Sequence, residues 1–488
     1  MADKWMFSLV LLLACGGGGT TTDGGGFDAV TLDMDVPDQS TWDDGFSADA
    51  ETTNVPVYRD EPFLQDRARW FTTGDGLPSD TVNAVFIEDD GSILAATDGG
   101  AARGVDGVFK ALPCAGSEAP VTDIVSNGST VAFLSGDSIW IRAADGACTK
   151  IALPSNPAGL TVAETEPFTV LVAGATGIYE WSAGSISTIP GTEGKDARDA
   201  EVIPDGRIAI ATGSCLVIAS KSEEAVAMCK AQGLPSDDVR SVAWDDSQGL
   251  LWIGTSLGLA SWKPGDKNAE PMVGEVGGLP YDDITSVATG ASGMVAAGTP
   301  LGALRREPAR WHLIHGRNLI PDNGVLDLAV EADDTLWIAT AQGLARITRV
   351  PTTLEDKAAF FDEATHARHD RMGMVSPCSL TQPGVLSTFQ THDDDNDGQW
   401  TEMYLAAQSF RCAVTKDADG CAWARASMEA MLKLESVTEI PGFFARSIVP
   451  GDECAAKQGG KAEWHLTSDE QWCWKGDPST DEFVGHIF

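Results

Sequence analysis

A run of acidic residues in the last quarter of the chain carries side chains that could do chemistry. It reads Asp393-Asp394-Asp395-Asn396-Asp397-Gly398. Carboxylates at Asp393, Asp395 and Asp397, with a glycine at the sharp turn, match the first half of a calcium loop. The closing glutamate is absent, because the twelfth position is tyrosine and Glu402 comes two residues early. The same carboxylates could instead begin a helix and accept bonds from its free N–H groups, so calcium binding and helix capping both remain open.

Two carboxyl groups could also hydrolyse a glycosidic bond. One group must be protonated and the other ionised, and the two must face a sugar across a cavity. Neighbouring aromatic rings could stack on that sugar, although aromatic residues more often lie in a core. The candidate catalytic residues are Asp395, Asp397, Asp481 and Glu482, and the candidate ligand-binding residues are Trp400, Trp472 and Trp474.

Helices are expected to position these groups. Apolar residues recur at helical spacing on either side of residues 415–420, which predicts an αα-hairpin. Residues 479–482 form a capping box that would open another helix. We therefore predict a separate helical domain over residues 351–488. The apolar positions are Met403, Ala407, Phe410 and Val414 in the first helix, and Trp423, Ala426, Ala430, Met431 and Leu434 in the second.

A short phrase recurs along the chain before this domain. Each copy precedes an apolar strand pattern and a small-residue segment, clearest at residues 251–259 and 336–344. Successive prolines of the phrase are about 157, about 45 and about 41 residues apart, so the unit is about 40 residues long. The copies are Gly76-Leu77-Pro78-Ser79-Asp80, Gly233-Leu234-Pro235-Ser236-Asp237, Gly278-Leu279-Pro280-Tyr281-Asp282 and the degenerate Leu319-Ile320-Pro321-Asp322.

Seven such units fit into residues 58–350. They start near residues 78, 117, 157, 196, 235, 280 and 321. The first four copies are less regular but keep small-residue strands at 94–97, 131–134, 171–177 and 208–213. Several short strands per unit are typical of a β-propeller blade, whereas a helical repeat would place apolar residues three and four apart. The sequence predicts an all-β, seven-bladed propeller.

The ends of the repeat region predict how the ring closes. Ala68-Arg69-Trp70-Phe71 precedes the first phrase just as Ala309-Arg310-Trp311-His312 precedes the last repeat. We expect the N-terminal side of the region to supply an outer strand to the final blade, which removes a free sheet edge.

These repeats resemble the two-component regulator propeller repeats. In that family Leu-Pro, a polar pair and a Leu-Trp-Ile-Gly-Thr-x-x-Gly-Leu segment recur in periplasmic sensor regions of hybrid histidine kinases and in secreted proteins. The resemblance covers about residues 58–350, with strong motifs in blades one, five, six and seven. Nothing after residue 350 looks like a membrane span, a phospho-acceptor helix or an ATP lid, so phosphotransfer is not expected.

The helical domain resembles the α/α-toroid domains attached to propellers in some bacterial secreted proteins. The resemblance rests on residues 395–404, 410–415 and 474–482 and covers about 110 residues. It implies an all-α architecture related to that of six-hairpin glycosidases and polysaccharide lyases. Since the last helix is short, we expect the toroid to be incomplete.

The N-terminal sequence predicts where in the cell the protein is located. Residues 6–13 are apolar but too few to span a bilayer, and they lead into Leu12-Leu13-Ala14-Cys15-Gly16. This resembles a bacterial lipobox, which implies cleavage before Cys15 and lipid on its thiol. Residues 16–57 contain no lysine or arginine and are rich in Gly, Thr and Asp, which predicts a disordered tether. By resemblance to Gram-negative lipoproteins, Gly16 implies the outer membrane.

Charge and cysteine content agree with this compartment. Acidic residues outnumber basic ones by 72 to 33, for a net charge of −39. Such a field repels nucleic acid and favours cations, so no nucleic-acid partner is expected. Cysteines that lie close in sequence predict disulfides in an oxidising periplasm, with Cys378 left over. These pairs are Cys215 with Cys229, Cys412 with Cys421, and Cys454 with Cys473.

The sequence thus predicts a lipid-anchored propeller of the bacterial cell envelope. Its expected role is ligand binding, sensing or interaction, with a glycan or an envelope protein as partner and the membrane reached through the N-terminal lipid. The alternative is a carbohydrate-active hydrolase or lyase that uses the carboxylates of the helical domain. Calcium is the one cofactor that the residues suggest.

Overall fold

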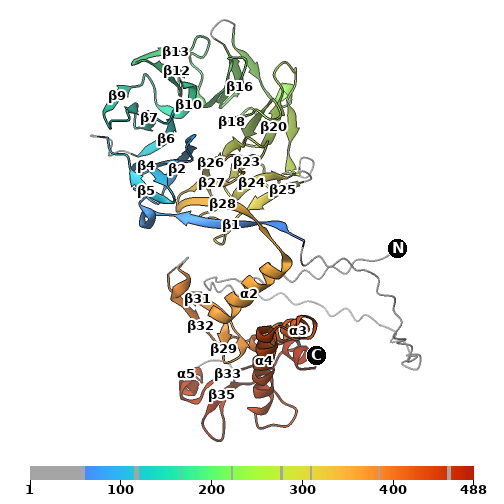
Figure 1. Cartoon of the computed structure of the whole chain (residues 1–488). Coiled ribbons are helices and arrows are strands. Elements are labelled where there is room, and N and C mark those ends of the chain that lie inside the picture. The colour runs from blue at the N-terminus through green and yellow to red at the C-terminus, as the bar shows by residue number, and fades with distance from the viewer. Residues whose placement is uncertain are drawn as a thin grey trace, which may run out of the picture. The chain divides into compact units, whose positions relative to one another are not determined.

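The described residues of the chain fall into two compact units, Phe63–Pro351 and a second unit that begins at Thr352 (Figure 1). The computed structural model describes residues 61–114, 120–165, 167–220, 224–274, 278–307, 310–382, 385–458 and 463–487. The lipobox with Cys15 and the tether, residues 16–57, lie outside these ranges.

Seven sheets of four strands make up the first unit, so the prediction of a seven-bladed propeller is confirmed. Blade 1 contains β2 (Val82–Ile87), β3 (Ile93–Thr97), β4 (Gly100–Val105) and β5 (Val108–Ala111). Blade 2 contains β6 (Val121–Ser126), β7 (Val131–Ser135), β8 (Ser138–Arg142) and β9 (Cys148–Ala152). Blade 3 contains β10 (Pro157–Thr165), β11 (Phe168–Gly174), β12 (Gly177–Ser182) and β13 (Ser185–Thr188). Blade 4 contains β14 (Ala197–Val202), β15 (Ile208–Thr212), β16 (Cys215–Ala219) and β17 (Val226–Met228).

The remaining blades follow the same order until the ring closes. Blade 5 contains β18 (Val239–Asp245), β19 (Leu250–Thr255), β20 (Gly258–Trp262) and β21 (Glu270–Met272). Blade 6 contains β22 (Ser286–Thr289), β23 (Val295–Thr299), β24 (Gly302–Glu307) and β25 (Arg310–Ile314). Blade 7 contains β26 (Val325–Val330), β27 (Leu336–Thr340), β28 (Gly343–Thr352) and, as its outer strand, β1 (Phe63–Phe71).

The N-terminal strand closes the ring as the sequence predicts. β1 pairs with β28 in the order β1-β28-β27-β26, and Trp70 Nε1 donates to the carbonyl of Leu319 at 2.9 Å. The first strands of successive blades lie side by side, and β26 lies beside β2. The blade 7 sheet therefore joins both ends of the repeat region.

The second strand of each blade is buried between its neighbours. In every blade except blade 5 all residues of this strand are buried. Because both faces of the strand meet other side chains, its sequence is a continuous apolar or small run rather than an alternation. This burial explains why the apolar pattern of the second strand is kept in the repeats that have lost the other motifs.

The recurring Gly-Leu-Pro phrase builds a turn before the first strands of blades 1, 5 and 6. Gly76 has φ +97°, and a Cβ there would lie 2.2 Å from the carbonyl oxygen of Phe109, so only glycine fits. Leu77 is buried, and Asp80 Oδ1 accepts from the Thr73 amide at 2.7 Å. Asp237 and Asp282 accept equivalent bonds in blades 5 and 6 at 2.7 Å. Short 3₁₀ turns, η3 (Thr73–Asp75) and η4 (Lys230–Gln232), precede two of these glycines.

The Thr-x-x-Gly part of the repeat closes the turn between the second and third strands. In five blades the threonine Oγ1 donates to the carbonyl three residues later at 2.7 Å, and these threonines are buried. The residues that repeat are therefore those that build turns. The five threonines are Thr97, Thr212, Thr255, Thr299 and Thr340.

The second unit combines helices with short strands. Its helices are α2 (Leu354–Arg368), α3 (Asp397–Thr415), α4 (Ala418–Ser436), α5 (Cys454–Lys457) and α6 (Thr480–Ile487), with 3₁₀ turns η5 (Leu386–Thr388) and η6 (Gly451–Glu453). Its strands are β29 (Asp370–Arg371), β30 (Met374–Val375), β31 (Cys378–Leu380), β32 (Phe389–Thr391), β33 (Ser447–Pro450), β34 (Trp464–Leu466) and β35 (Trp472–Lys475).

The predicted C-terminal helices are confirmed, including the hairpin of α3 and α4 and the helix that opens at Thr480. The prediction of helices alone needs a correction, because β33, β35 and β34 also form a three-stranded sheet. Strands of two to four residues are too short to leave a periodic pattern, so the sequence did not reveal them. The described part of this unit contains one αα-hairpin, and the toroid remains a prediction.

Four disulfides cross-link the described residues. The three pairs that lie close in sequence form as predicted, and Cys114 bonds to Cys148, which sequence proximity did not suggest. Cys378 is outside any disulfide, as predicted, and its buried Sγ lies 3.7 Å from His369 Nε2. None of the helices in the described ranges is both long and apolar enough to cross a membrane.

Candidate functional site

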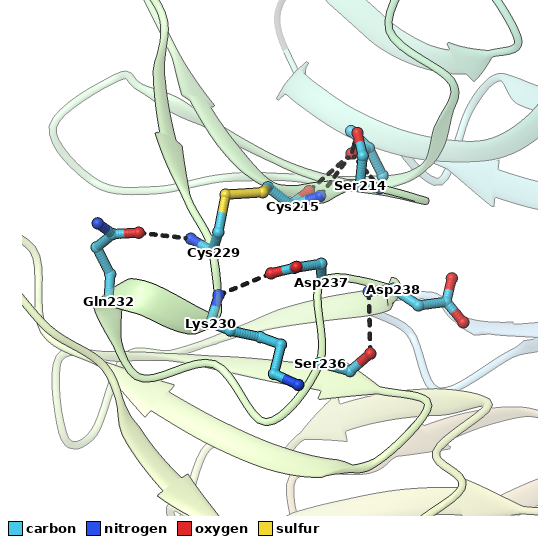
Figure 2. Close-up of a disulfide and its surroundings, with 9 residues drawn as sticks. Ser214, Cys215, Cys229, Lys230, Gln232, Ser236, Asp237 and Asp238 are labelled. Atoms are coloured by element: carbon cyan, nitrogen blue, oxygen red, sulfur yellow. Dashed lines mark hydrogen bonds between the residues drawn. A yellow bond between two sulfur atoms is a disulfide. The ribbon is translucent and has the colours of Figure 1, made fainter.

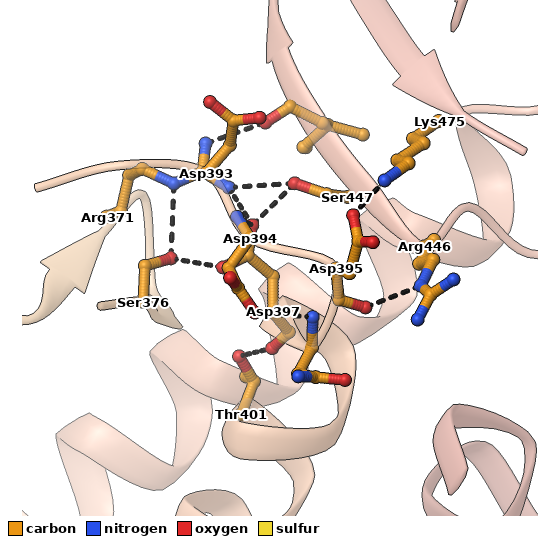
Figure 3. A network of polar contacts seen from close by, with 12 residues as sticks. Arg371, Ser376, Asp393, Asp394, Asp395, Asp397, Thr401, Arg446, Ser447 and Lys475 are labelled. Atoms are coloured by element: carbon orange, nitrogen blue, oxygen red, sulfur yellow. Dashed lines mark hydrogen bonds and ion pairs between the residues drawn. The ribbon is translucent and has the colours of Figure 1, made fainter. Parts of the chain in front are cut away.

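The acidic run before α3 is organised around Asp397, which is fully buried (Figure 3). Ser376 Oγ donates to its carboxylate at 2.7 Å and Ser447 Oγ at 2.5 Å, and the Arg371 guanidinium forms an ion pair with it. Burial raises the pKa of Asp397, and the Arg371 charge opposes that rise. A carboxylate with these partners holds α3 against β30 and β33 and has little capacity left for a ligand.

The other two candidate calcium ligands face different cations. Asp393 pairs with Lys457, and Asp395 is exposed and pairs with Lys475. Arg446 Nε also donates to the main-chain carbonyl of Asp395 at 2.6 Å. Among the described residues the only His, Cys, Asp and Glu ligand atoms that converge are those of Cys215, Cys229 and Asp237, and both cysteines are in a disulfide. The arrangement favours an acidic helix start over a calcium loop.

The remaining candidate carboxyls lie at the start of α6. Asp481 is exposed, whereas Glu482 is fully buried. Glu482 Oε2 accepts from the Ser479 amide at 2.8 Å, and its Oε1 lies 3.2 Å from Arg446 Nε. Burial raises the pKa of Glu482. The structure thus places Asp397 and Glu482 inside the protein and leaves Asp395 and Asp481 at the surface.

The three candidate tryptophans differ in exposure. Trp474 is buried, with its ring centroid 4.3 Å from that of His465. Trp472 is half-buried, and the Lys433 ammonium lies 4.8 Å from its ring centroid. Trp400 alone of the three is exposed. A groove of about 340 Å³ does lie beside α6, but Phe443, Phe444 and Phe483 line it rather than these tryptophans.

A second candidate site lies on one face of the propeller. We call it the repeat-turn face: it carries the Gly-Leu-Pro loops and the turns between second and third strands. The register of blade 5 places both on the same side, because Val239 at the start of β18 pairs with Thr255 at the end of β19. The face consists of loops 72–80, 229–237, 278–282 and 316–323 and turns 97–100, 212–215, 255–258, 299–302 and 340–343.

Alternating charges cross three blades at this face. Arg198 Nη1 of blade 4 lies 2.5 Å from Asp238 Oδ1, and Arg240 Nη1 of blade 5 lies 2.5 Å from Asp283 Oδ1. Arg240 Nε also lies 3.4 Å from Asp238 Oδ2. We call these four residues the charge ladder. Burial alone would raise the pKa of Asp238, but the Arg198 hydrogen bond and the two arginine charges hold it below its usual value.

The Cys215–Cys229 disulfide fixes the loop that leads to Asp238, one of the four residues of the charge ladder (Figure 2). The Lys230 amide donates to Asp237 Oδ1 at 2.7 Å, and the Asp238 amide donates to Ser236 Oγ at 3.1 Å. These bonds join the end of blade 4 to the start of blade 5. Asp238 is therefore held in place before any ligand arrives, which lowers the ordering cost of binding.

Exposed leucines lie on the same face as the ladder. Leu257 and Leu301 occupy the same turn position in blades 5 and 6 and are 55% and 51% exposed, and Leu326 is exposed at the start of blade 7. At this position the other blades have Gly99, Asp137, Thr176, Ser214 and Gln342. Sequence reasoning missed this group because it followed the residues that repeat; the available signal was the positions that change from blade to blade.

Half-buried carboxyls on the innermost strands were also missed. Asp123, Asp199 and Asp327 hold one equivalent position in the first strands of blades 2, 4 and 7. Each accepts an amide of the next blade's first strand, from Leu160 at 2.6 Å, Val242 at 2.9 Å and Val85 at 3.0 Å. Burial raises the pKa of all three, to about 6 for Asp327. Burial and the Asp199 charge raise the pKa of Glu201 to about 8.

Comparisons with known proteins identify the fold only. No protein family and no curated protein matches the sequence. The extracellular domain of a B. thetaiotaomicron protein described as the hybrid two component system BT3049 superposes with a TM-score of 0.50 at 16% identity, over 59% of this chain and 42% of that one. The extracellular domain of BT4673, from the same organism, gives 0.49 at 15% identity over 59% and 40%.

A streptogramin B lyase gives a TM-score of 0.49 at 12% identity over 58% of this chain and 98% of that one. The chain spans 40% of the length of the first solved structure it resembles. At these identities the BT3049 domain supports the propeller fold of the first unit and nothing about its ligand.

Proposed function

We propose that this protein is a lipid-anchored binding or sensing module of the bacterial cell envelope, whose recognition surface is the repeat-turn face of its propeller. The proposal rests on the charge ladder. Its four side chains are partly exposed, Asp238 is held by a disulfide-fixed loop, and exposed leucines lie on the same face. Preorganised charges beside apolar side chains are what a selective binding surface requires.

The fold comparison supports a sensing role, since the BT3049 protein is described as a two component system and its propeller is extracellular. The lipobox-like sequence at Cys15 and the acidic tether support attachment to the outer membrane by an N-terminal lipid. A glycan or an envelope protein remains the proposed partner.

The alternative function is a carbohydrate-active hydrolase or lyase in the second unit. It would require a protonated and an ionised carboxyl on the two sides of a substrate. Asp397 and Glu482 are buried and bonded, so an enzyme would have to use Asp395 or Asp481 with a group from elsewhere. The binding module is therefore the better supported function.

Glycan and peptide arrays probed with the full chain test the proposal. Hits should lose at least about tenfold in affinity when Arg198 and Arg240 are both changed to alanine, since buried charge pairs at an interface are worth a factor of this order or more. The matched control is Arg207→Ala, because Arg207 also pairs with an aspartate, at 2.6 Å, but follows β14 at its other end. Hits that bind both variants equally, or arrays without hits, would remove the proposed surface.

A further inference from the structure

Helix α3 presents two faces of opposite character. The face toward the rest of the unit is mainly polar: Asp397, Thr401 and Gln408 are buried, and Gln408 Nε2 donates to Asp362 Oδ1 of α2 at 2.6 Å. Leu405 adds an apolar contact with the core of the unit. The opposite face is exposed and apolar. We call it the α3 seam, and it consists of Trp400, Met403, Ala407, Phe410 and Val414.

The seam has the spacing of a coiled-coil core. Its residues are separated by three, four, three and four positions, which is the a/d pattern of a heptad repeat. Such a stripe packs against another helix, whereas an amphipathic helix at a domain surface exposes its polar side. Phe410 and Val414 are 65% and 75% exposed, so among the described residues nothing covers this end of the seam.

The partner helix within the unit is occupied elsewhere. α4 buries Ala430, Met431 and Leu434 in a cluster with Met374 and Trp474, to which the seam residues do not belong. The positions that flank the seam on one side are the small Ala406 and Ala413. Small flanking residues let a second helix approach closely.

The charge of the seam indicates which molecule supplies the second helix. The chain carries 72 acidic residues, yet none lies in the seam or at Ala406 and Ala413. A basic partner would find no carboxylate there to pair with, whereas a second copy, itself at −39, can approach only through a surface free of like charge. An uncharged a/d stripe is complementary to itself, as a two-fold interface requires.

The available area is sufficient for a weak dimer. The exposed parts of the seam side chains amount to roughly 500 Å² per copy, or about 1,000 Å² for a pair, which is the lower limit of a specific interface.

We propose that the α3 seam is a self-association surface, through which two copies of this chain pair their α3 helices about a two-fold axis. The pairing is independent of the ligand proposed for the propeller. It would place two binding surfaces in one assembly, and the resulting bivalency would raise the avidity for a repetitive partner.

Sedimentation velocity of the full chain tests the pairing. We expect a monomer–dimer equilibrium at concentrations on the order of 10 to 100 µM, which is the range for interfaces of this size without strong anchors. Phe410→Glu should weaken it by more than about tenfold, because a charge would be buried at the centre of the seam. Ser409→Glu is the matched control: it adds the same charge to an exposed neighbour outside the seam.

Two further measurements keep the test decisive. Phe410 is mostly exposed, so Phe410→Glu should leave the circular dichroism spectrum and melting temperature of the monomer unchanged. Raising salt from 0.05 to about 0.5 M should strengthen the dimer, since screening reduces repulsion between acidic copies while apolar contacts persist. A monomer at every concentration, equal effects of the two variants, or binding of the seam to phosphatidylglycerol vesicles by a monomer would overturn the proposal.

Discussion

Asp66 in the first strand and Arg305, far along the chain in blade 6, form a bidentate ion pair. Arg305 Nη1 lies 2.8 Å from Asp66 Oδ1, and Nη2 lies 3.2 Å from Oδ2. Both side chains are almost fully buried, at 4% and 8% exposure, and His312 Nε2 lies 3.2 Å from the same carboxylate. The pair locks β1, the strand that closes blade 7, onto blade 6, so the ring is held by charge as well as by β-pairing.

Breaking this pair should open the ring. Asp66→Ala leaves the Arg305 charge buried without its main partner, which typically costs about 3 to 5 kcal/mol of unfolding free energy. Urea denaturation of the full chain measures the loss. Arg310→Ala is the control, because Arg310 is exposed and its pair with Glu307 should contribute no more than about 1 kcal/mol. If Asp66→Ala lowers the unfolding free energy no more than Arg310→Ala does, the pair does not hold β1 to blade 6.

The same pair should be insensitive to mild acid. Burial alone would raise the pKa of Asp66, but the hydrogen bonds and charges of His312 and Arg305 lower it to about 2. A depressed carboxyl pKa stabilises the fold above the unfolded value near 3.9, and that contribution disappears as pH falls toward 2. The cost of Asp66→Ala should therefore be constant from pH 8 to about pH 5 and shrink below pH 4.

Asp327 should make the propeller more stable in mild acid than at neutral pH. Burial raises its pKa to about 6, and the nearby Asp199 charge adds to the rise. A raised carboxyl pKa gives stability that is complete below about 3.9 and is lost as pH rises through 6, up to about 3 kcal/mol.

Asp327→Asn should abolish much of this pH dependence. The amide oxygen can still accept the Val85 amide, which now donates to Asp327 Oδ2 at 3.0 Å, but no charge forms. Urea midpoints at pH 5 and pH 8 measure the effect, and the variant should exceed the wild type at pH 8. Asp327→Ala separates the two effects, since it removes the acceptor along with the charge. An unchanged pH slope in Asp327→Asn would contradict the assignment.

Calcium should not stabilise the second unit. Asp393, Asp395 and Asp397 are each paired with a different basic residue, so ion binding would have to break those pairs. The melting temperature should stay the same in 5 mM calcium chloride and in EDTA. Asp397→Ala should instead destabilise the unit by about 3 to 5 kcal/mol, because Arg371 loses its carboxylate. A rise in melting temperature with calcium would restore the metal interpretation.

Cys15 should be required for lipid attachment. If residues 12–16 are a lipobox, palmitate supplied to a Gram-negative host that expresses the full chain will label the wild type and not Cys15→Ala. The variant should also leave the membrane fraction. The buried thiol of Cys378 provides the control, because Cys378→Ala should label normally. Label that persists on Cys15→Ala would contradict the lipid anchor.

The propeller could be predicted because its signals are local. Gly76 and Asp80 are needed for one turn, Thr255 for another, and the buried second strands need apolar residues along their whole length. Requirements of this kind recur from blade to blade and so leave a period in the sequence. The closing strand was recognisable for the same reason, since Trp70 and Trp311 occupy corresponding outer strands.

The two proposed surfaces, the charge ladder and the α3 seam, could not be predicted because they depend on contacts between distant residues. Helical spacing predicted α3 but not which face is buried: the apolar stripe is exposed, and a polar bond from Gln408 to Asp362 holds the other face. Likewise, nothing in the sequence pairs Arg198 with Asp238, 40 residues later. The candidate carboxyls were found by type, but burial of Asp397 and Glu482 is a property of the packed unit.

Hydrogen–deuterium exchange of the full chain, with and without the strongest hit from the arrays, locates the ligand-binding surface. The ligand should protect amides of loop 229–240 and turns 255–258 and 299–302, which surround the charge ladder. Residues 352–487 should exchange at unchanged rates. Protection confined to the second unit, with the repeat-turn face unaffected, would rule out that face as the recognition surface and favour a ligand site among the C-terminal carboxylates.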